Sequence, residues 1–86
     1  MATMQTYSAT GFKAVRADSA WTAAAIFAKR EVRRQYGRGG YLVGVRCDFG
    51  EQGDRVMIFD ATIGCLPAAG GYTEEAFWVT VRREAE

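Results

Sequence analysis

Five cations gather in residues 28–40, AKREVRRQYGRGG, and they are the strongest chemical feature of this 86-residue sequence: Lys29, Arg30, Arg33, Arg34 and Arg38. On a helix the first four would fall within roughly 140° of the surface. Such a cluster can bind phosphates, dock on an acidic protein surface, or form a solvated face that offsets the negative helix end. One or two cations would suffice for the last role, so five are a surplus. All three interpretations remain open.

The residue types that most catalytic sites use are scarce. The chain has no histidine, which removes Ser–His and Cys–His pairs and the commonest transition-metal ligand. Glu74 and Glu75 are adjacent, so on an extended chain they point to opposite sides and form a poor acid–base pair. The stretch GRGGYLVG fits neither a dinucleotide-binding turn nor a P-loop. We therefore expect a protein that is not an enzyme and has no cofactor or metal site.

The charges are unevenly distributed along the chain, although its net charge is only +1. Residues 1–46 carry eight Lys and Arg against two Asp and Glu, whereas residues 47–86 carry three against eight. This asymmetry can orient a protein against a charged partner. It can equally arise from oppositely charged faces that pair within one domain.

Length and composition indicate one domain over residues 1–86, with 49% hydrophobic residues to build a core. Cys47 and Cys65 form no CxxC motif, so two free thiols in a reducing compartment are expected. The longest apolar run, residues 23–28, is far shorter than the roughly 20 residues that a membrane span needs. The N-terminus lacks the pattern of a secretory signal. A cytoplasmic location without a membrane partner follows as the expectation.

A long helix is predicted over residues 18–36. Asp18 or Ser19 can serve as the N-cap, and Gly37 suits the position after the last turn. One stripe roughly 120° wide should face a sheet. It contains Trp21, Ala24, Ala25, Ala28, Val32 and Tyr36. The alanines would let the helix backbone approach the sheet closely, with Trp21 and Tyr36 closing its two ends.

Four strands are predicted, over residues 6–17, 41–49, 55–64 and 76–83. Gly11 marks a bulge in the first, EQGD at 51–54 suits a hairpin turn, and residues 66–75 form a loop. The last three strands form an antiparallel meander, and the helical crossover should make the first strand parallel to a neighbour. The expected fold is α+β, in the order β-α-β-β-β, with one helix on one face of a four-stranded, mostly antiparallel sheet.

Alternation along the strands separates their two faces. On residues 41–49 it places together Tyr41, Val43, Val45, Cys47 and Phe49. On the later strands Val56, Ile58 and Trp78 fall on the face without the helix. Exposed together, they would form an apolar patch of the kind that marks a partner surface or a homodimer. The alternative is that the N-terminal segment or the loop at 66–73 covers them.

Two further apolar side chains, Ile26 and Phe27, fall outside the core stripe of the helix and beside its arginines. Large apolar residues bordered by arginine are common at interfaces. The alternative is that Phe27 packs under the loop at 66–73. The candidate partner-binding residues are therefore Lys29, Arg30, Arg33, Arg34, Arg38, Ile26, Phe27 and Trp78.

Within residues 6–83, ADSAWTAAA enters the predicted helix, RRQYG ends it, and the strands YLVGVRCDF, RVMIFDATIG and FWVTVRR follow. This organisation resembles the small single-domain proteins of phages and mobile elements, including some anti-CRISPR proteins. The resemblance implies a cytoplasmic inhibitor that works without catalysis, by occupying a surface of a CRISPR-Cas effector complex. Arg30, Arg33, Arg34 and Arg38 would then meet an acidic patch or block a nucleic-acid path. Alternatively, Glu51 and Asp54 would mimic phosphates.

Three functional hypotheses follow from these features. The first is the non-enzymatic, protein-binding inhibitor. The second is a small nucleic-acid-binding module that uses the basic helix face. The third is a homodimeric structural or regulatory subunit that associates through Trp78 or a sheet edge.

Overall fold

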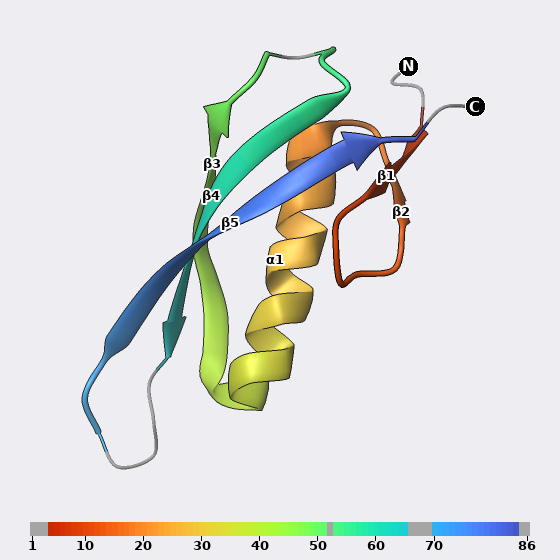
Figure 1. Cartoon of the computed structure of the whole chain (residues 1–86). Coiled ribbons are helices and arrows are strands. Elements are labelled where there is room, and N and C mark those ends of the chain that lie inside the picture. The colour runs from red at the N-terminus through yellow and green to blue at the C-terminus, as the bar shows by residue number, and fades with distance from the viewer. Residues whose placement is uncertain (1–3, 52, 66–69, 85–86) are drawn as a thin grey trace.

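One helix lies in the hollow of a curled, five-stranded antiparallel sheet in the computed structural model, which describes residues 4–51, 53–65 and 70–84 (Figure 1). The strand order is β2-β1-β5-β4-β3, and every neighbouring pair is antiparallel. The elements are β1 (Gln5–Ser8), β2 (Val15–Ala17), α1 (Ala20–Tyr36), a short 3₁₀ turn η1 (Gly37–Gly39), β3 (Gly40–Phe49), β4 (Val56–Cys65) and β5 (Thr73–Arg83). The α+β class and the single helix on one sheet face are confirmed.

The ends of α1 form as the sequence predicts. The Ser19 hydroxyl accepts a hydrogen bond from the Thr22 amide at 3.1 Å, which satisfies one of the free N–H groups of the first turn. Gly37 has φ of 60°, where a Cβ would be strained, and its N–H donates to the Arg33 carbonyl. Both caps hold α1 to a fixed length, so its cationic last turn meets the start of β3.

The first predicted strand is wrong as a single strand, because residues 6–17 form most of a hairpin. A loop containing Gly11, with φ of 88°, separates β1 from β2. The expected parallel pairing is also wrong, since β1 pairs with β5 in antiparallel register, Tyr7 opposite Arg83. The crossover through α1 joins β2 to β3, and these two strands do run in the same direction, as does β5. However, β1 lies between β2 and β5 in the sheet, and this extra strand makes every pair antiparallel.

Two irregularities in β3 change which of its residues face the helix. The register between β3 and β4 shifts between Leu42 and Gly44 and again between Cys47 and Phe49. Residues directly opposite one another point to the same face, so Val45 shares the inner face with Ala61, whereas Phe49 shares the outer face with Ile58. The predicted common face for Tyr41, Val43, Val45, Cys47 and Phe49 is therefore wrong, because each β-bulge resets the alternation.

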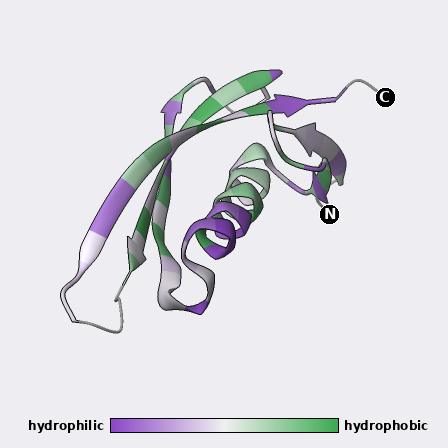
Figure 2. Ribbon diagram, turned by 60° about the horizontal axis from the view of Figure 1, so that its bottom comes forward, coloured by the Kyte–Doolittle hydropathy of each residue, from purple (hydrophilic) through white to green (hydrophobic). Residues whose placement is uncertain are grey.

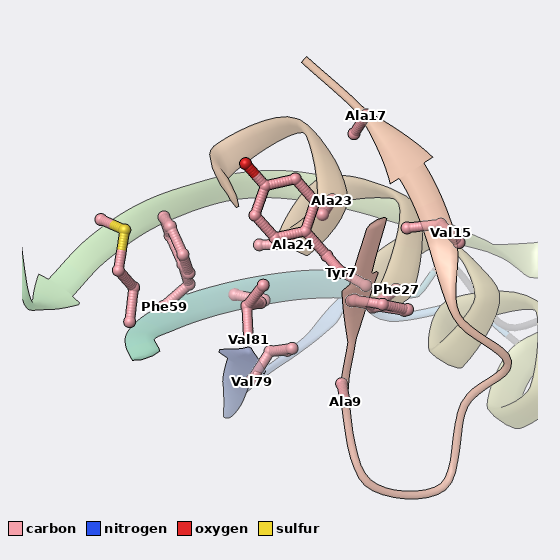
Figure 3. Close-up of a cluster of buried hydrophobic side chains, with 13 residues drawn as sticks. Tyr7, Ala9, Val15, Ala17, Ala23, Ala24, Phe27, Phe59, Val79 and Val81 are labelled. Atoms are coloured by element: carbon pink, nitrogen blue, oxygen red, sulfur yellow. The ribbon is translucent and has the colours of Figure 1, made fainter. Parts of the chain in front are cut away.

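The core fills the space between α1 and the sheet, and Figure 3 shows its labelled side chains. The largest fully buried side chains are Phe27, Phe59, Ile63 and Val81. Ala23, Ala24 and Ala28 on α1 have no exposed surface, which brings the helix backbone close to the strands as expected. The buried stripe is displaced from the predicted one towards Phe27, because the β1–β2 hairpin packs on that flank of the helix. Trp21, predicted to be buried, is 52% exposed.

Candidate binding surfaces

The five cations of the predicted cluster do not act alike, because Glu31 neutralises one of them. Arg34 pairs with Glu31, its Nε lying 3.3 Å from Oε2, and the Gln35 amide donates to Oε1 at 3.0 Å. The Glu31 side chain is only 11% exposed. Hydrogen bonding from Arg34 lowers the pKa of Glu31 despite the opposing effect of burial. The positive charge of Arg34 is therefore neutralised by a neighbour within the helix.

Arg30 turns towards the N-terminal hairpin. Its Nη1 donates to the Lys13 carbonyl at 3.2 Å, in the loop between β1 and β2. A carbonyl does not neutralise a guanidinium, so Arg30 keeps its charge while tying the loop to α1. Arg30 and Arg34 thus lie on the hairpin side of the helix.

The other three cations, Lys29, Arg33 and Arg38, converge on a groove between the last turns of α1 and the start of β3. We call it the basic groove; its volume is about 670 Å³ and its floor includes Val32, Gly37, Gly40, Tyr41 and Leu42. All three cations are exposed, and none takes part in an ion pair found within the described ranges. Figure 2 shows the hydrophilic colour of the C-terminal turns of α1, which supply Lys29 and Arg33.

Two tyrosines pack together on the sheet face opposite α1, because Tyr41 lies opposite Gly64, an outward-facing position of β4. The rings of Tyr41 and Tyr72 have centroids 6.3 Å apart and planes 28° from parallel. Both cover Gly64 on β4: a Cβ there would lie 2.7 Å from the Tyr72 hydroxyl and 3.1 Å from the Tyr41 ring. The Tyr72 hydroxyl donates to Glu74 at 2.7 Å, and hydrogen bonding with Tyr41 and Glu74 raises the pKa of Tyr72. We call this pair the tyrosine shelf.

The predicted surface role of Phe27 is wrong. Its side chain has no exposed area, and its ring centroid lies 5.3 Å from that of Phe12 in the loop between β1 and β2. This loop covers the flank of α1 that the sequence pattern left open. Ile26 is half-buried and packs against the same core. Phe27 therefore does not belong with the exposed arginines, whereas Ile26 keeps part of its surface exposed.

Trp78 belongs to a different surface, on the sheet face opposite α1. It is 71% exposed, and Phe49 on the same face is 67% exposed. Ile58 lies directly opposite Phe49 and diagonally beside Trp78, whose own opposite residue is Asp60. With Val56, two positions before Ile58, these side chains form the outer-face patch: Phe49, Val56, Ile58 and Trp78. No element among the described residues covers it; the loop invoked as a cover includes residues 66–69, which lie outside that description.

Charged groups border the outer-face patch. Arg46 donates to Asp60 Oδ2 at 3.4 Å across the β3–β4 pair, and Arg82 lies opposite Val56. The other Asp60 oxygen, Oδ1, is buried and has no hydrogen-bond partner among the described residues. The surface is therefore an aromatic and aliphatic centre with a polar rim, the composition found at protein interfaces.

Another hollow, of about 580 Å³, lies beside the start of α1. Its walls include Tyr7, Trp21, Cys47 and Arg83. Two of its polar side chains are hydrogen-bonded to main-chain carbonyls: Trp21 Nε1 donates to the Val45 carbonyl and Arg83 Nη1 to the Gly53 carbonyl, each at 3.1 Å. The Cys47 thiol is 3.4 Å from the Gly50 carbonyl.

Three further observations concern the turn at 51–54, metal binding and membrane-spanning segments. The Asp54 carboxylate accepts the Glu51 amide at 2.8 Å and closes the predicted hairpin turn. Within the described residues, no group of three or more Cys, Asp or Glu side chains is placed to hold a metal ion. In the same part of the chain, no helix has the length and apolarity to cross a membrane.

Comparison with known proteins gives no relative: no protein family, curated protein or solved structure matches this chain. Functional inference depends on the two surfaces themselves. Sequence reasoning missed Phe49, Tyr41 and Tyr72 as surface residues. The bulges in β3 leave Tyr41 and Phe49 on the outer face, whereas Val45 and Cys47 lie on the inner one.

Proposed function

We propose that this chain is a non-enzymatic protein that binds a protein partner through the outer-face patch. Within that class we propose an anti-CRISPR inhibitor, acting in the host cytoplasm by occupying a surface of a CRISPR-Cas effector complex. The observation that carries the proposal is the exposure of Trp78 beside Ile58 and Phe49 on an uncovered sheet face. The effector is taken as the partner because of the organisation that the chain shares with anti-CRISPR proteins.

The physical basis is the cost of leaving such a surface in water. Monomeric proteins rarely expose contiguous apolar patches, and large ones usually mark interaction sites. Tryptophan and arginine are the residues most enriched among those that dominate binding energy. Trp78 would supply the buried anchor, and Arg46 and Arg82 at the rim would pair with acidic or carbonyl groups of the partner.

Inhibition by occupation needs no catalytic group. A bound domain of this size blocks whatever surface it covers, so its potency depends on affinity alone. This is consistent with a chain that has no histidine and in which Glu31 and Asp54 serve structural contacts, the Glu31–Arg34 pair and the turn at 51–54.

A plasmid-interference assay tests this function. Cells with a defined CRISPR-Cas system reject a targeted plasmid, and co-expression of the chain should restore transformation for at least one effector type. Trp78→Ala should abolish this effect. Tyr72→Ala removes another exposed aromatic side chain outside the patch, so it should retain the effect. If no effector type is inhibited, the anti-CRISPR assignment is wrong.

A homodimer through the same face is the main competing use of the patch, since a second copy would bury Trp78 equally well. Light scattering over a concentration series separates the two. The proposal expects a monomer throughout, whereas a dimer that Trp78→Ala dissociates would assign the patch to self-association.

A further inference from the structure

We infer that the hollow beside the start of α1 is a binding site for a small neutral molecule. The molecule is mostly apolar and carries one hydrogen-bonding group, as a phenol does, which pairs with the buried hydroxyl of Tyr7. This inference is independent of the proposed protein partner, because the residues that line the hollow include none of the outer-face patch.

The hollow lies where the sheet extends past the beginning of the helix. α1 begins at Ala20, and the last part of β3 and the first part of β4 continue beyond that point (Figure 1). Met57 and Phe59 on β4 line the hollow there, and they are only 8% and 1% exposed. A molecule that enters the hollow therefore meets an apolar floor.

Tyr7 is the residue that points to a ligand, because it is 6% exposed and lines the same hollow. Unlike the Tyr72 hydroxyl, its hydroxyl makes no hydrogen bond to any described residue. Among those residues, Asp60 Oδ1 is the fully enclosed side-chain oxygen without a partner, so the Tyr7 hydroxyl opens on the hollow. Figure 3 shows it on the side of the ring away from Val79 and Val81. Buried tyrosine hydroxyls usually have a partner, and the hollow is where one can enter.

Two hydrogen bonds hold the walls of the hollow in place before any ligand binds. Trp21 Nε1 donates to the Val45 carbonyl at 3.1 Å, which fixes the indole between α1 and β3. Arg83 Nη1 donates to the Gly53 carbonyl at 3.1 Å, which ties the turn before β4 to the end of β5. The volume of about 580 Å³ lies in the range of small-molecule sites. Because the walls are already fixed, binding costs little ordering of side chains.

The charges around the hollow favour a neutral ligand. Asp18, Asp54 and Arg83 all line it, so charges of both signs are present and neither an anion nor a cation is selected. An ion placed against Met57 and Phe59 would lose its hydration without gaining an opposite charge at that depth. A single hydroxyl group can donate one hydrogen bond or accept one. The ligand is therefore an apolar ring or chain whose one polar group lies at its buried end.

The test compares para-ethylphenol with ethylbenzene, which has the same ring and chain but lacks the hydroxyl. Each is titrated to about 1 mM, and the amide NMR signals of the native chain are followed. The signals of Trp21, Met57 and Phe59 should shift, and para-ethylphenol should bind about fivefold more tightly than ethylbenzene. The phenethylammonium cation and the phenylpropionate anion should both bind more weakly than para-ethylphenol.

Tyr7→Phe removes the hydroxyl and keeps the ring. It should lower the affinity for para-ethylphenol about fivefold, to that of ethylbenzene, and leave the affinity for ethylbenzene unchanged. Because the hydroxyl has no partner among the described residues, this variant should not lower the thermal unfolding midpoint. A lower midpoint together with unchanged affinities would assign the hydroxyl to the fold and overturn the inference.

A pair of variants on β3 tests the location. Cys47→Phe adds bulk at an exposed position that lines the hollow, and it should abolish binding. Val43→Phe adds similar bulk at an exposed position of the same strand outside the hollow, and it should bind normally. Far-UV circular dichroism checks that every variant is folded. Equal affinities of the native chain for the two ligands, equal losses in the two β3 variants, or no shift at about 1 mM would each refute the inference. Trp78→Ala should bind para-ethylphenol normally, so failure here and failure of the protein partner are distinguishable.

Discussion

Glu31 and Arg34 form an ion pair one turn apart on α1, with the carboxylate nearly buried and the guanidinium 72% exposed. The pair removes one charge from the arginine-rich surface and anchors the buried face of the helix at the same time. It also makes the helix sensitive to pH.

The first prediction concerns this pH dependence. Because folding lowers the pKa of Glu31, its ionised form stabilises the fold at pH values above the ordinary glutamate pKa of about 4.3. That contribution is lost as the pH falls through the lower, folded value. Glu31→Gln should therefore reduce the free energy of unfolding by about 1 kcal/mol at pH 7, and the difference from the native chain should shrink below about pH 4. Urea unfolding at both pH values measures the difference in free energy of unfolding between Glu31→Gln and the native chain. Glu84→Gln, at an exposed position, is the control. A difference that did not change with pH would contradict the role of the Glu31 carboxylate.

The second prediction compares Phe27 and Trp78, which the sequence pattern placed together among the candidate partner-binding residues. Phe27 is fully buried and Trp78 is mostly exposed. Phe27→Ala should cost about 3–5 kcal/mol of folding free energy, which is a large share of the roughly 5–15 kcal/mol by which native domains are stable. Phe27→Leu keeps most of the volume and should cost only about 1 kcal/mol. Trp78→Ala should change the free energy of unfolding by less than about 0.5 kcal/mol. Chemical denaturation of the three variants would refute the burial pattern if Trp78→Ala proved the more damaging.

The third prediction compares two glycines on β3. A Cβ at Gly40 would lie 2.7 Å from side-chain atoms of Val32 and Tyr36, whereas at Gly44 it would meet nothing within 4 Å. Gly40→Ala should therefore force α1 away from the strand and cost about 1–3 kcal/mol. Gly44→Ala should be neutral or stabilise the chain by up to about 1 kcal/mol, because it restricts the unfolded state. Thermal unfolding midpoints that fell equally for both variants would contradict the close contact between α1 and β3.

Local chemistry made much of the fold predictable. Ser19 and Gly37 have cap chemistry that depends only on near neighbours, so both ends of α1 were placed correctly. The hairpin turn at 51–54 and the three long strands followed from alternation and turn residues for the same reason.

The errors arose where one residue has two structural uses. Gly11 can form a bulge or open a loop, and its φ of 88° serves a loop that reverses the chain. That reversal created β2, brought Phe12 over Phe27 and displaced the buried face of α1. The bulges in β3 are equally invisible in an alternating sequence, because they depend on pairing with β4. Consequently the basic cluster was found from the sequence, but the pairing of Arg34 with Glu31 was not, nor was the Tyr41–Tyr72 pair on the outer sheet face.

The central claim is that the outer-face patch binds a protein, and a direct binding measurement tests it. Purified CRISPR-Cas effector complexes of the main types are titrated with the native chain, Trp78→Ala and Tyr72→Ala by isothermal calorimetry. The account predicts that one effector binds the native chain and Tyr72→Ala with equal affinity, while Trp78→Ala binds at least about 30-fold more weakly, as expected for an anchor worth 2 kcal/mol or more. Equal affinity for Trp78→Ala, or no binding to any effector, would contradict it.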